Sequence, residues 1–233
     1  MTAPTDDIAR VVCLRTISGA RHQLDVARWT APAEPADLIA VEGIPGPVID
    51  VGCGPGRIAA ALAERRVPCL GIDVAPTALA AARARGASVL DRSVFDPVPG
   101  EGRWATALLF DGNVGIGGDP SALLSRVGRM VRPGGLIVVE LGRPGLGLRQ
   151  EDVTVDVPGA HERWFPWAWV GVDVLDQVIR PTGLVTEMCA PIDDRWFARL
   201  RRPPSTTHSG CSARDPTRHS QPGGTLGGVG SAS

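Results

Sequence analysis

The chain has 233 residues and a formal net charge of −1. This charge is unlike that of a nucleic-acid-binding protein, whose surface is basic. Charged residues interrupt residues 1–20, so we expect no secretory signal there, and no apolar run is long enough to span a bilayer. The five cysteines are scattered without a Cys-x-x-Cys pair. We therefore expect a reduced, cytoplasmic protein with no disulfide framework, no metal site and no membrane or nucleic-acid partner.

The first part of the chain predicts a short extension ahead of the main domain. Apolar and polar residues alternate over residues 11–29 around Gly19, which predicts a β-hairpin turning at that glycine. Residues 34–43 predict a short helix that ends at Gly43. We accordingly divide the chain into an N-terminal extension (residues 1–33) and a main domain that begins at residue 34.

From residue 47 onward, predicted strands alternate with predicted helices. The strands are expected at residues 47–51, 68–72, 88–90, 106–110 and 136–141, and the helices at residues 56–66, 76–85 and 120–131. A turn at residues 132–135 separates the last of these helices from the strand that follows. Such alternation implies right-handed crossovers and a mostly parallel sheet with helices packed on it.

Beyond residue 141 the pattern changes. We predict a glycine-rich loop at 143–149, a strand at 153–157 and a helix at 172–179, and then two strands at 184–190 and 195–201. A turn at residues 191–194 would join the last two strands into an antiparallel hairpin. Residues 202–233 are rich in Pro, Ser, Thr and Gly and predict a disordered tail. The main domain is therefore expected to span residues 34–201.

The turn at residues 50–56 carries the clearest functional pattern. It reads Asp-Val-Gly-Cys-Gly-Pro-Gly, with glycines at 52, 54 and 56 and with Cys53 between two of them. It follows the first strand of the parallel sheet, and ligands bind beyond the carboxyl ends of such strands. Glycines let the backbone approach a ligand closely, and the helix that follows presents unpaired N–H groups. We therefore expect this loop, Cys53 included, to hold a cofactor through its backbone.

The spacing of these glycines distinguishes two kinds of cofactor. Dinucleotide enzymes favour Gly-x-Gly-x-x-Gly, but Arg57 stands here where that pattern needs its third glycine. Asp50 at the end of the strand would repel a pyrophosphate, whereas its carboxylate suits the ammonium group of a methionine moiety. The loop therefore favours S-adenosylmethionine (SAM), and a nicotinamide-dependent oxidoreductase remains an alternative that rests on the fold alone.

A second carboxylate ends the next predicted strand. Asp73 can accept hydrogen bonds from two ribose hydroxyls, as acidic residues do in dinucleotide sites. The alternative is that Asp73 caps the helix that follows it. Together with the glycine loop, its position favours the ribose interpretation.

Three motifs together resemble the class I, seven-stranded SAM-dependent methyltransferases. Val48–Arg57 is similar to the first motif of that family, Gly71–Pro76 to its second, and Val131–Leu141 to the segment leading into its fifth strand. The resemblance implies a doubly wound α/β fold: a mostly parallel seven-stranded sheet, helices on both faces and a C-terminal antiparallel hairpin. It also implies SAM as the cofactor, with Val74 next to Asp73 in the binding site.

The same resemblance implies contacts from two further loops. After the third strand, Ser93 takes the position where the family often has an acidic residue for the adenine, and Val94 lies beside the ring; a shifted register would put Asp91 there instead. After the fourth strand, Asp111 is expected at the cofactor and Asn113 at the acceptor. The alternative for this second loop is a turn built from good turn formers.

The methyl acceptor is the least defined part of the prediction. Residues 161–169 hold three of the six tryptophans, so Trp164 and Trp167 are expected to wall an acceptor pocket, with His161 as a weak candidate for a general base. The alternative is that these rings pack against the terminal hairpin. The chain lacks the Asn/Asp-Pro-Pro-aromatic motif that the family uses to methylate planar amines of DNA or of protein glutamine. We therefore predict a small-molecule methyltransferase; a non-catalytic SAM-binding regulatory protein is the alternative.

Overall fold

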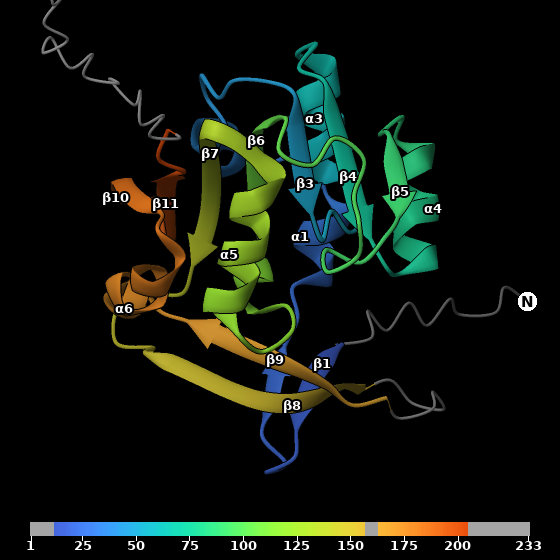
Figure 1. The fold of residues 1–233 in the computed structure, drawn as a ribbon. Coiled ribbons are helices and arrows are strands. Elements are labelled where there is room, and N and C mark those ends of the chain that lie inside the picture. The colour runs from blue at the N-terminus through green and yellow to red at the C-terminus, as the bar shows by residue number, and fades with distance from the viewer. Residues whose placement is uncertain (1–11, 157–162, 205–233) are drawn as a thin grey trace, which may run out of the picture.

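The computed structural model describes residues 12–156 and 163–204, which form two β-sheets with helices around the larger one (Figure 1). The larger sheet has seven strands in the order β10-β11-β7-β6-β3-β4-β5, and the smaller has four in the order β2-β1-β8-β9. Within these two ranges, no helix is both long and apolar enough to cross a membrane. Most of the predicted tail, residues 205–233, lies outside the described residues.

The seven-stranded sheet confirms the predicted fold class. Its strands are β3 (Val48–Val51), β4 (Cys69–Asp73), β5 (Val89–Asp91), β6 (Trp104–Leu109), β7 (Val131–Leu141), β10 (Val185–Ile192) and β11 (Arg195–Arg201). Strands β3 to β7 are parallel, and β11 is antiparallel to both of its neighbours, β7 and β10. The chain runs outward from β3 to β5 and then returns to β6 on the other side of β3. The carboxyl ends of β3 and β6 therefore form the switch point at which open α/β sheets bind ligands.

Helices cover both faces of this sheet, as predicted. They are α2 (Pro35–Ala40), α3 (Arg57–Glu64), α4 (Pro76–Ala84), α5 (Pro120–Met130) and α6 (Leu175–Ile179). Leu123 of α5 shares one buried core with Ile49, whereas Leu62 of α3 shares another with Val48. Successive residues of a strand point to opposite faces, so neighbouring residues of β3 supply the two cores. This explains why β3 is buried along its whole length.

The smaller sheet joins two segments that are far apart in the sequence. Its strands are β1 (Cys13–Thr16), β2 (Arg21–Gln23), β8 (Leu148–Asp156) and β9 (Phe165–Val170). The predicted hairpin at Gly19 is confirmed, because β1 and β2 pair on either side of it. Strand β1 also pairs with β8, with Leu14 opposite Val155. Figure 1 shows this sheet beyond the carboxyl ends of the parallel strands, so we name it the cap sheet.

Several predicted boundaries were wrong, each for a physical reason. Residues 26–30, expected in the hairpin, form helix α1 (Val26–Thr30), which begins where the Asp25 carboxylate accepts a hydrogen bond from the Arg28 amide at 2.9 Å. Strand β8 begins at Leu148, inside the predicted loop, because it pairs with β9 from that residue onward. Strand β7 includes the predicted turn at 132–135, and its ladder with β6 is irregular there. The remaining short elements are 3₁₀ turns: η1 (Asn113–Gly115), η2 (Val172–Val174) and η3 (Arg180–Thr182).

Candidate functional site

The glycine loop between β3 and α3 adopts a conformation that needs its glycines. Gly52, Gly54 and Gly56 have φ angles of 71°, 51° and 80°, in the left-handed region that L-residues avoid. A Cβ atom at Gly52 would lie 2.6 Å from the side-chain nitrogen of Asn113, and one at Gly56 would lie 2.7 Å from the Cβ atom of Ala82. A Cβ atom at Gly54 would meet nothing within 4 Å. Gly54 therefore leaves open space beside the backbone, as a ligand-binding loop requires.

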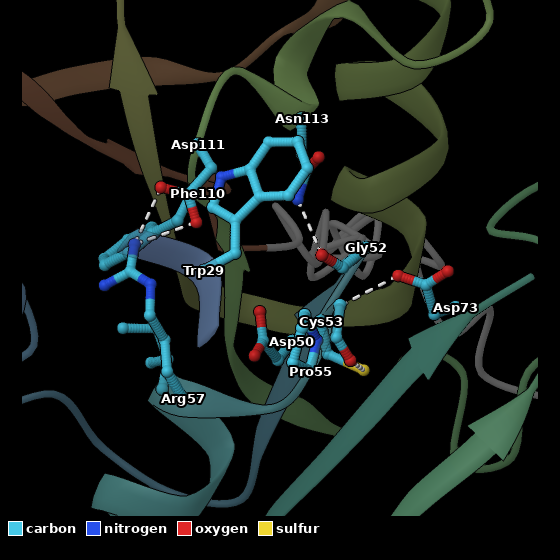
Figure 2. A pocket seen from close by; sticks show the side chains of 12 residues that line it. Trp29, Asp50, Gly52, Cys53, Pro55, Arg57, Asp73, Phe110, Asp111 and Asn113 are labelled. Carbon is cyan, nitrogen blue, oxygen red and sulfur yellow. Dashed lines mark hydrogen bonds and ion pairs between the residues drawn. The ribbon is translucent and has the colours of Figure 1, made fainter. Parts of the chain in front are cut away.

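A cavity of about 120 Å³, which we name the donor cavity, lies against this loop (Figure 2). Its lining residues are Trp29, Asp50, Gly52, Cys53, Gly54, Pro55, Arg57, Ile58, Asp73, Phe110, Asp111 and Asn113. The structure thus brings together residues that the sequence predicted in three separate segments: the loop at 50–56, the end of β4, and the loop after β6. Gly56 is buried against α4 beneath the cavity.

Asp50 is a buried carboxylate that has no partner within the described part of the chain. The residue is 3% exposed, and its side chain has no hydrogen bond or ion pair with any residue that the structure describes. Burial, and then the charges of Asp111 and Asp73, raise its pKa to about 7. A buried charge is costly unless it is paired, so a cationic group placed in the donor cavity would stabilise the ionised form.

Asp73 already makes three hydrogen bonds at the end of β4. Its Oδ2 accepts from the Gly54 amide at 2.8 Å, and its Oδ1 accepts from the Val74 and Ala75 amides at 2.7 and 2.9 Å. The side chain therefore orders the turn before α4 and fixes the glycine loop, but it does not cap the helix, whose N-cap residue is Ala75 without a side-chain cap. A carboxylate oxygen accepts about two hydrogen bonds, so Oδ2 retains one position for a hydroxyl of a ligand.

Behind the donor cavity lies a buried ion-pair network that the sequence did not predict. Its members are Asp37, Arg57, Asp111, Glu140 and Arg195. Arg57 pairs with Asp37, and its Nη2 lies 2.7 and 2.8 Å from the two oxygens of Asp111. Arg195 lies 2.6 Å from Asp37 and 2.7 Å from Glu140. Burial raises the pKa of Asp111 despite the nearby guanidinium of Arg57.

Asn113 and Cys53 support the loop in different ways. The side-chain amide of Asn113 donates to the carbonyl oxygens of Val51 and Gly52 at 3.1 and 2.8 Å, which ties the loop after β6 to the glycine loop. The thiol of Cys53 fills the space over Gly71, where a Cβ atom would lie 2.6 Å from its sulfur. Burial raises the pKa of this thiol. Cys53 is therefore a small neutral filler rather than a nucleophile.

The residues expected near an adenine lie beside the donor cavity rather than in its lining. Val74 follows the end of β4 and is 64% exposed. The Ser93 hydroxyl accepts a hydrogen bond from the Phe95 amide at 3.2 Å, and the side chain of Val94 is buried in the core under α5. Asp91 ends β5 with its side chain exposed. The geometry gives none of these four residues a contact that assigns it to a ligand.

A second cavity of about 260 Å³ adjoins the first, and Trp29 and Asp111 line both. We name it the acceptor cavity. Trp167 lines it, as predicted for a pocket wall, whereas Trp164 is 39% exposed and lies under the guanidinium of Arg15 at 5.3 Å. The alternative, that these tryptophans pack against the terminal hairpin, was wrong, because they lie on or next to β9 in the cap sheet. His161 lies outside the described residues.

Sequence reasoning missed much of the lining of these cavities, including Trp29, His22 and Arg57. Trp29 and His22 belong to a segment that was interpreted only as a hairpin, and Arg57 was considered only as the place of a missing glycine. Asp25 is a helix N-cap residue, and that pattern could have predicted α1 and placed Trp29 on it. No local pattern indicates that a lone arginine such as Arg57 is buried.

The glycine-rich loop after β6 is explained by packing. A Cβ atom at Gly115 would overlap the carbonyl oxygen of Ala168, and one at Gly118 would lie 2.7 Å from the Cβ atom of Pro166. Ile116 forms an isolated β-bridge with Trp167. Strand β9 therefore lies directly on this loop, and its small residues let the cap sheet approach the main sheet.

Comparison with protein families identifies the central part of the chain. Residues 48–135 match the model described as a methyltransferase domain. This segment runs from β3 into β7 and therefore contains the glycine loop, Asp73 and the loop after β6. A comparison with curated proteins finds no significant match.

Solved structures of methyltransferases share the fold. A SAM-dependent methyltransferase from Bacteroides fragilis, in complex with S-adenosyl-L-homocysteine, is 19% identical with a TM-score of 0.69, over 83% of this chain and 88% of that one. The CcbJ methyltransferase of Streptomyces caelestis is 16% identical with a TM-score of 0.58, over 75% and 92% of the two chains. The 1,6-didemethyltoxoflavin-N1-methyltransferase of Burkholderia thailandensis is 20% identical with a TM-score of 0.56, over 77% and 81%. At these identities, the likeness establishes the fold.

Proposed function

We propose that the chain is a class I, SAM-dependent methyltransferase that methylates a small molecule, because residues 48–135 match a methyltransferase domain and the fold is that of solved methyltransferases. The donor cavity would hold SAM, and the adjoining acceptor cavity would hold the molecule that is methylated. When bound, SAM supplies an electrophilic methyl group on a sulfonium. The protein then has to bind both molecules and align them, which can supply much of the acceleration.

The unpaired carboxylate of Asp50 is the observation that carries this proposal. It lies buried at the donor cavity, next to the open space at Gly54. The ammonium group of a methionine moiety would pair with it, which removes the cost of a buried isolated charge. Asp73 Oδ2, with one free acceptor position, would bind a ribose hydroxyl. Pockets for drug-sized ligands have volumes of roughly 300–1,000 Å³, and the donor cavity is smaller. We therefore assign only the methionine and ribose parts of SAM to this cavity.

The same residues argue against a nicotinamide dinucleotide. Three carboxylates, those of Asp50, Asp73 and Asp111, line the donor cavity and would repel a pyrophosphate. The one guanidinium in its lining belongs to Arg57, which is already paired with Asp37 and Asp111. The charge at this site therefore suits a cationic ligand.

A small-molecule acceptor fits the acceptor cavity. The cap sheet and α1 supply much of its lining, so residues from both segments of the cap would shield the acceptor from solvent. A volume of about 260 Å³ suits a compact molecule rather than a segment of a macromolecule. The free cysteines at positions 13, 53, 69 and 189 support a reducing compartment, and we propose the cytoplasm.

Isothermal titration calorimetry tests the cofactor assignment. We expect the protein to bind SAM and S-adenosylhomocysteine with micromolar affinity and to bind NADH far more weakly. Release of S-adenosylhomocysteine during incubation with a panel of small metabolites would then identify acceptors. No binding of either SAM or its product would contradict the proposal, and binding of SAM without turnover of any acceptor would favour a non-catalytic regulatory protein instead.

A further inference from the structure

We propose that the acceptor cavity binds a planar, uncharged aromatic hydroxyl compound and that His22 accepts the proton of that hydroxyl during methyl transfer. This inference rests on the proposed function, because it takes the donor cavity as the SAM site. It assigns a chemical class to the acceptor and a catalytic role to a residue of β2. The walls of the cavity and its charges support it, and so do the ring nitrogens of His22, which make no hydrogen bond with the residues that the structure describes.

The walls of the acceptor cavity are aromatic on several sides. Trp29 comes from α1, and Trp167 and Trp169 come from β9. The ring of His22 lies against Trp169, with 4.4 Å between the ring centroids and 37° between the planes. Aromatic walls favour flat ring systems, which stack on them or meet their edges. A volume of about 260 Å³ limits the acceptor to about one or two fused rings.

The charges around the acceptor cavity disfavour an anionic acceptor. Three carboxylates, those of Asp25, Asp111 and Glu140, line it together with a single guanidinium, that of Arg28. With the partners of Asp111 and Glu140 included (Arg57, Arg195 and the Asp37 that these two arginines share), four carboxylates still face three guanidinium groups, so an acceptor that carries a carboxylate or phosphate would enter a surplus of one negative charge. Asp111 and Glu140 are already paired with arginines, so neither is a free proton acceptor.

His22 is the lining residue to which we assign the proton. It lines the cavity, and neither of its ring nitrogens makes a hydrogen bond within residues 12–156 and 163–204. A neutral hydroxyl is a weak nucleophile and needs to lose its proton as it attacks, and imidazole is the commonest side chain for that task. In the step we propose, the acceptor oxygen bonds to the methyl carbon and the carbon–sulfur bond breaks. Its electron pair stays on sulfur, and the hydroxyl proton passes to a nitrogen of His22.

Binding of two matched probes tests the acceptor class. We expect 2-naphthol to bind the protein saturated with S-adenosylhomocysteine and to quench its tryptophan fluorescence. The carboxylate 6-hydroxy-2-naphthoate should bind at least about tenfold more weakly because of the acidic surplus. Equal or tighter binding of the carboxylate, or no binding of 2-naphthol, would overturn the assignment of the cavity.

Turnover tests the role of His22. Against a panel of one- and two-ring phenols and the corresponding aryl amines, we expect phenols to be methylated in preference to amines. His22→Gln should lower kcat for a responsive phenol by about 10²–10⁴-fold, with little change in KM. The loss should be much smaller for 4-nitrophenol at about pH 8.5, because its hydroxyl is already largely ionised in water. Arg21→Gln, an exposed neighbour on β2, is the matched control and should keep the parent kcat.

The outcomes separate this inference from the proposed function. SAM binding by His22→Gln, and by His22→Phe, which keeps a ring against Trp169, would show that both variants are folded. With SAM bound, a failure to methylate any phenol, or an equal loss for ionised and un-ionised phenols, would overturn the role of His22 while leaving the SAM site in place. A failure of the parent to bind SAM would instead contradict the proposed function itself.

Discussion

The Nη2 atom of Arg57 lies 2.7 and 2.8 Å from the two carboxylate oxygens of Asp111, a residue 54 positions later in the chain. This pair joins the start of α3 to the loop after β6, on the two sides of the switch point. Asp111 has a φ angle of 54°, which is unfavourable for a residue other than glycine, and its amide also donates to Glu140 at 2.7 Å. The pair therefore fixes a wall that the donor and acceptor cavities share.

Replacing Arg57 is expected to destabilise the protein strongly. Arg57→Met would leave Asp37 and Asp111 without their guanidinium partner, and breaking a buried pair costs about 3–5 kcal/mol. The free energy of unfolding, measured with urea, should fall by that amount. Arg83→Met on the exposed side of α4 should change it by less than about 0.5 kcal/mol. Equal stabilities of these two variants would mean that the network is not buried as described.

A methyl group at Gly54 is expected to impair SAM binding more than stability. In Gly54→Ala the new Cβ atom would enter open space in the donor cavity, and the positive φ would cost about 1–2 kcal/mol. Calorimetry should show at least about tenfold weaker SAM binding. Gly86→Ala introduces a similar strain at a φ of 80°, also into open space but after α4, and should bind SAM as the parent does. If both variants kept the parent affinity, Gly54 would not face the ligand.

The contact between β9 and the loop after β6 can be tested with two other glycines. In Gly115→Ala the new Cβ atom would overlap the carbonyl oxygen of Ala168, so the cap sheet would have to move. We expect a loss of about 1–3 kcal/mol in the free energy of unfolding and weaker binding of acceptor-site probes. Gly128→Ala in α5, where the nearest atom would be Leu184 Cδ2 at 3.5 Å, should be neutral or stabilising. If Gly128→Ala lowered the free energy of unfolding and Gly115→Ala did not, the proposed packing of β9 on this loop would be contradicted.

The sequence predicted the parts of the fold that depend on local patterns. The alternation of strands and helices between residues 47 and 141 follows from short-range periodicity. This periodicity was sufficient to predict the succession of strands and helices along the chain. The glycine spacing at residues 50–56 likewise predicted a cofactor-binding loop, although it did not predict the residues that surround that loop. Pairings between distant segments leave no such local pattern. Leu14 lies opposite Val155, and Arg195 reaches Asp37 from 158 positions away.

In the site, too, the residues next to local motifs were predicted and the residues brought in by distant segments were missed. Asp50 and Asp73 were predicted to lie in the cofactor site because each ends a strand next to a recognisable motif, and both line the donor cavity. Trp29 and His22 were missed because they reach the site through the cap sheet and α1, whose position depends on the pairing of β1 with β8. The glycines of residues 112–118 look like a ligand loop in the sequence, yet two of them, Gly115 and Gly118, make room for β9, which lies far along the chain.

The buried carboxylate of Asp50 is expected to lower stability at high pH. Its folded-state pKa of about 7 lies above the 3.8 of an ordinary aspartate, so the folded protein binds the proton more tightly than the unfolded chain does. Its contribution to stability is therefore present below pH 3.8 and is lost as pH rises toward 7. Asp50→Asn should raise the free energy of unfolding at pH 8, by at most about 4 kcal/mol, and the gain should shrink toward pH 4. An equal gain at both pH values would mean that ionisation of Asp50 is not its source.

The pairing of Asp50 with a cationic ligand is tested most directly by titrating SAM into the parent protein at pH 5.5 and pH 7.5. Binding of an ammonium favours the ionised carboxylate, so below its free-state pKa of about 7 the protein has to lose a proton on binding. We expect the dissociation constant to be about 25-fold larger at pH 5.5 than at pH 7.5 in the parent. Asp50→Asn should bind SAM weakly at both values. A parent affinity that does not change with pH, or an Asp50→Asn protein that binds SAM as tightly as the parent, would contradict the account.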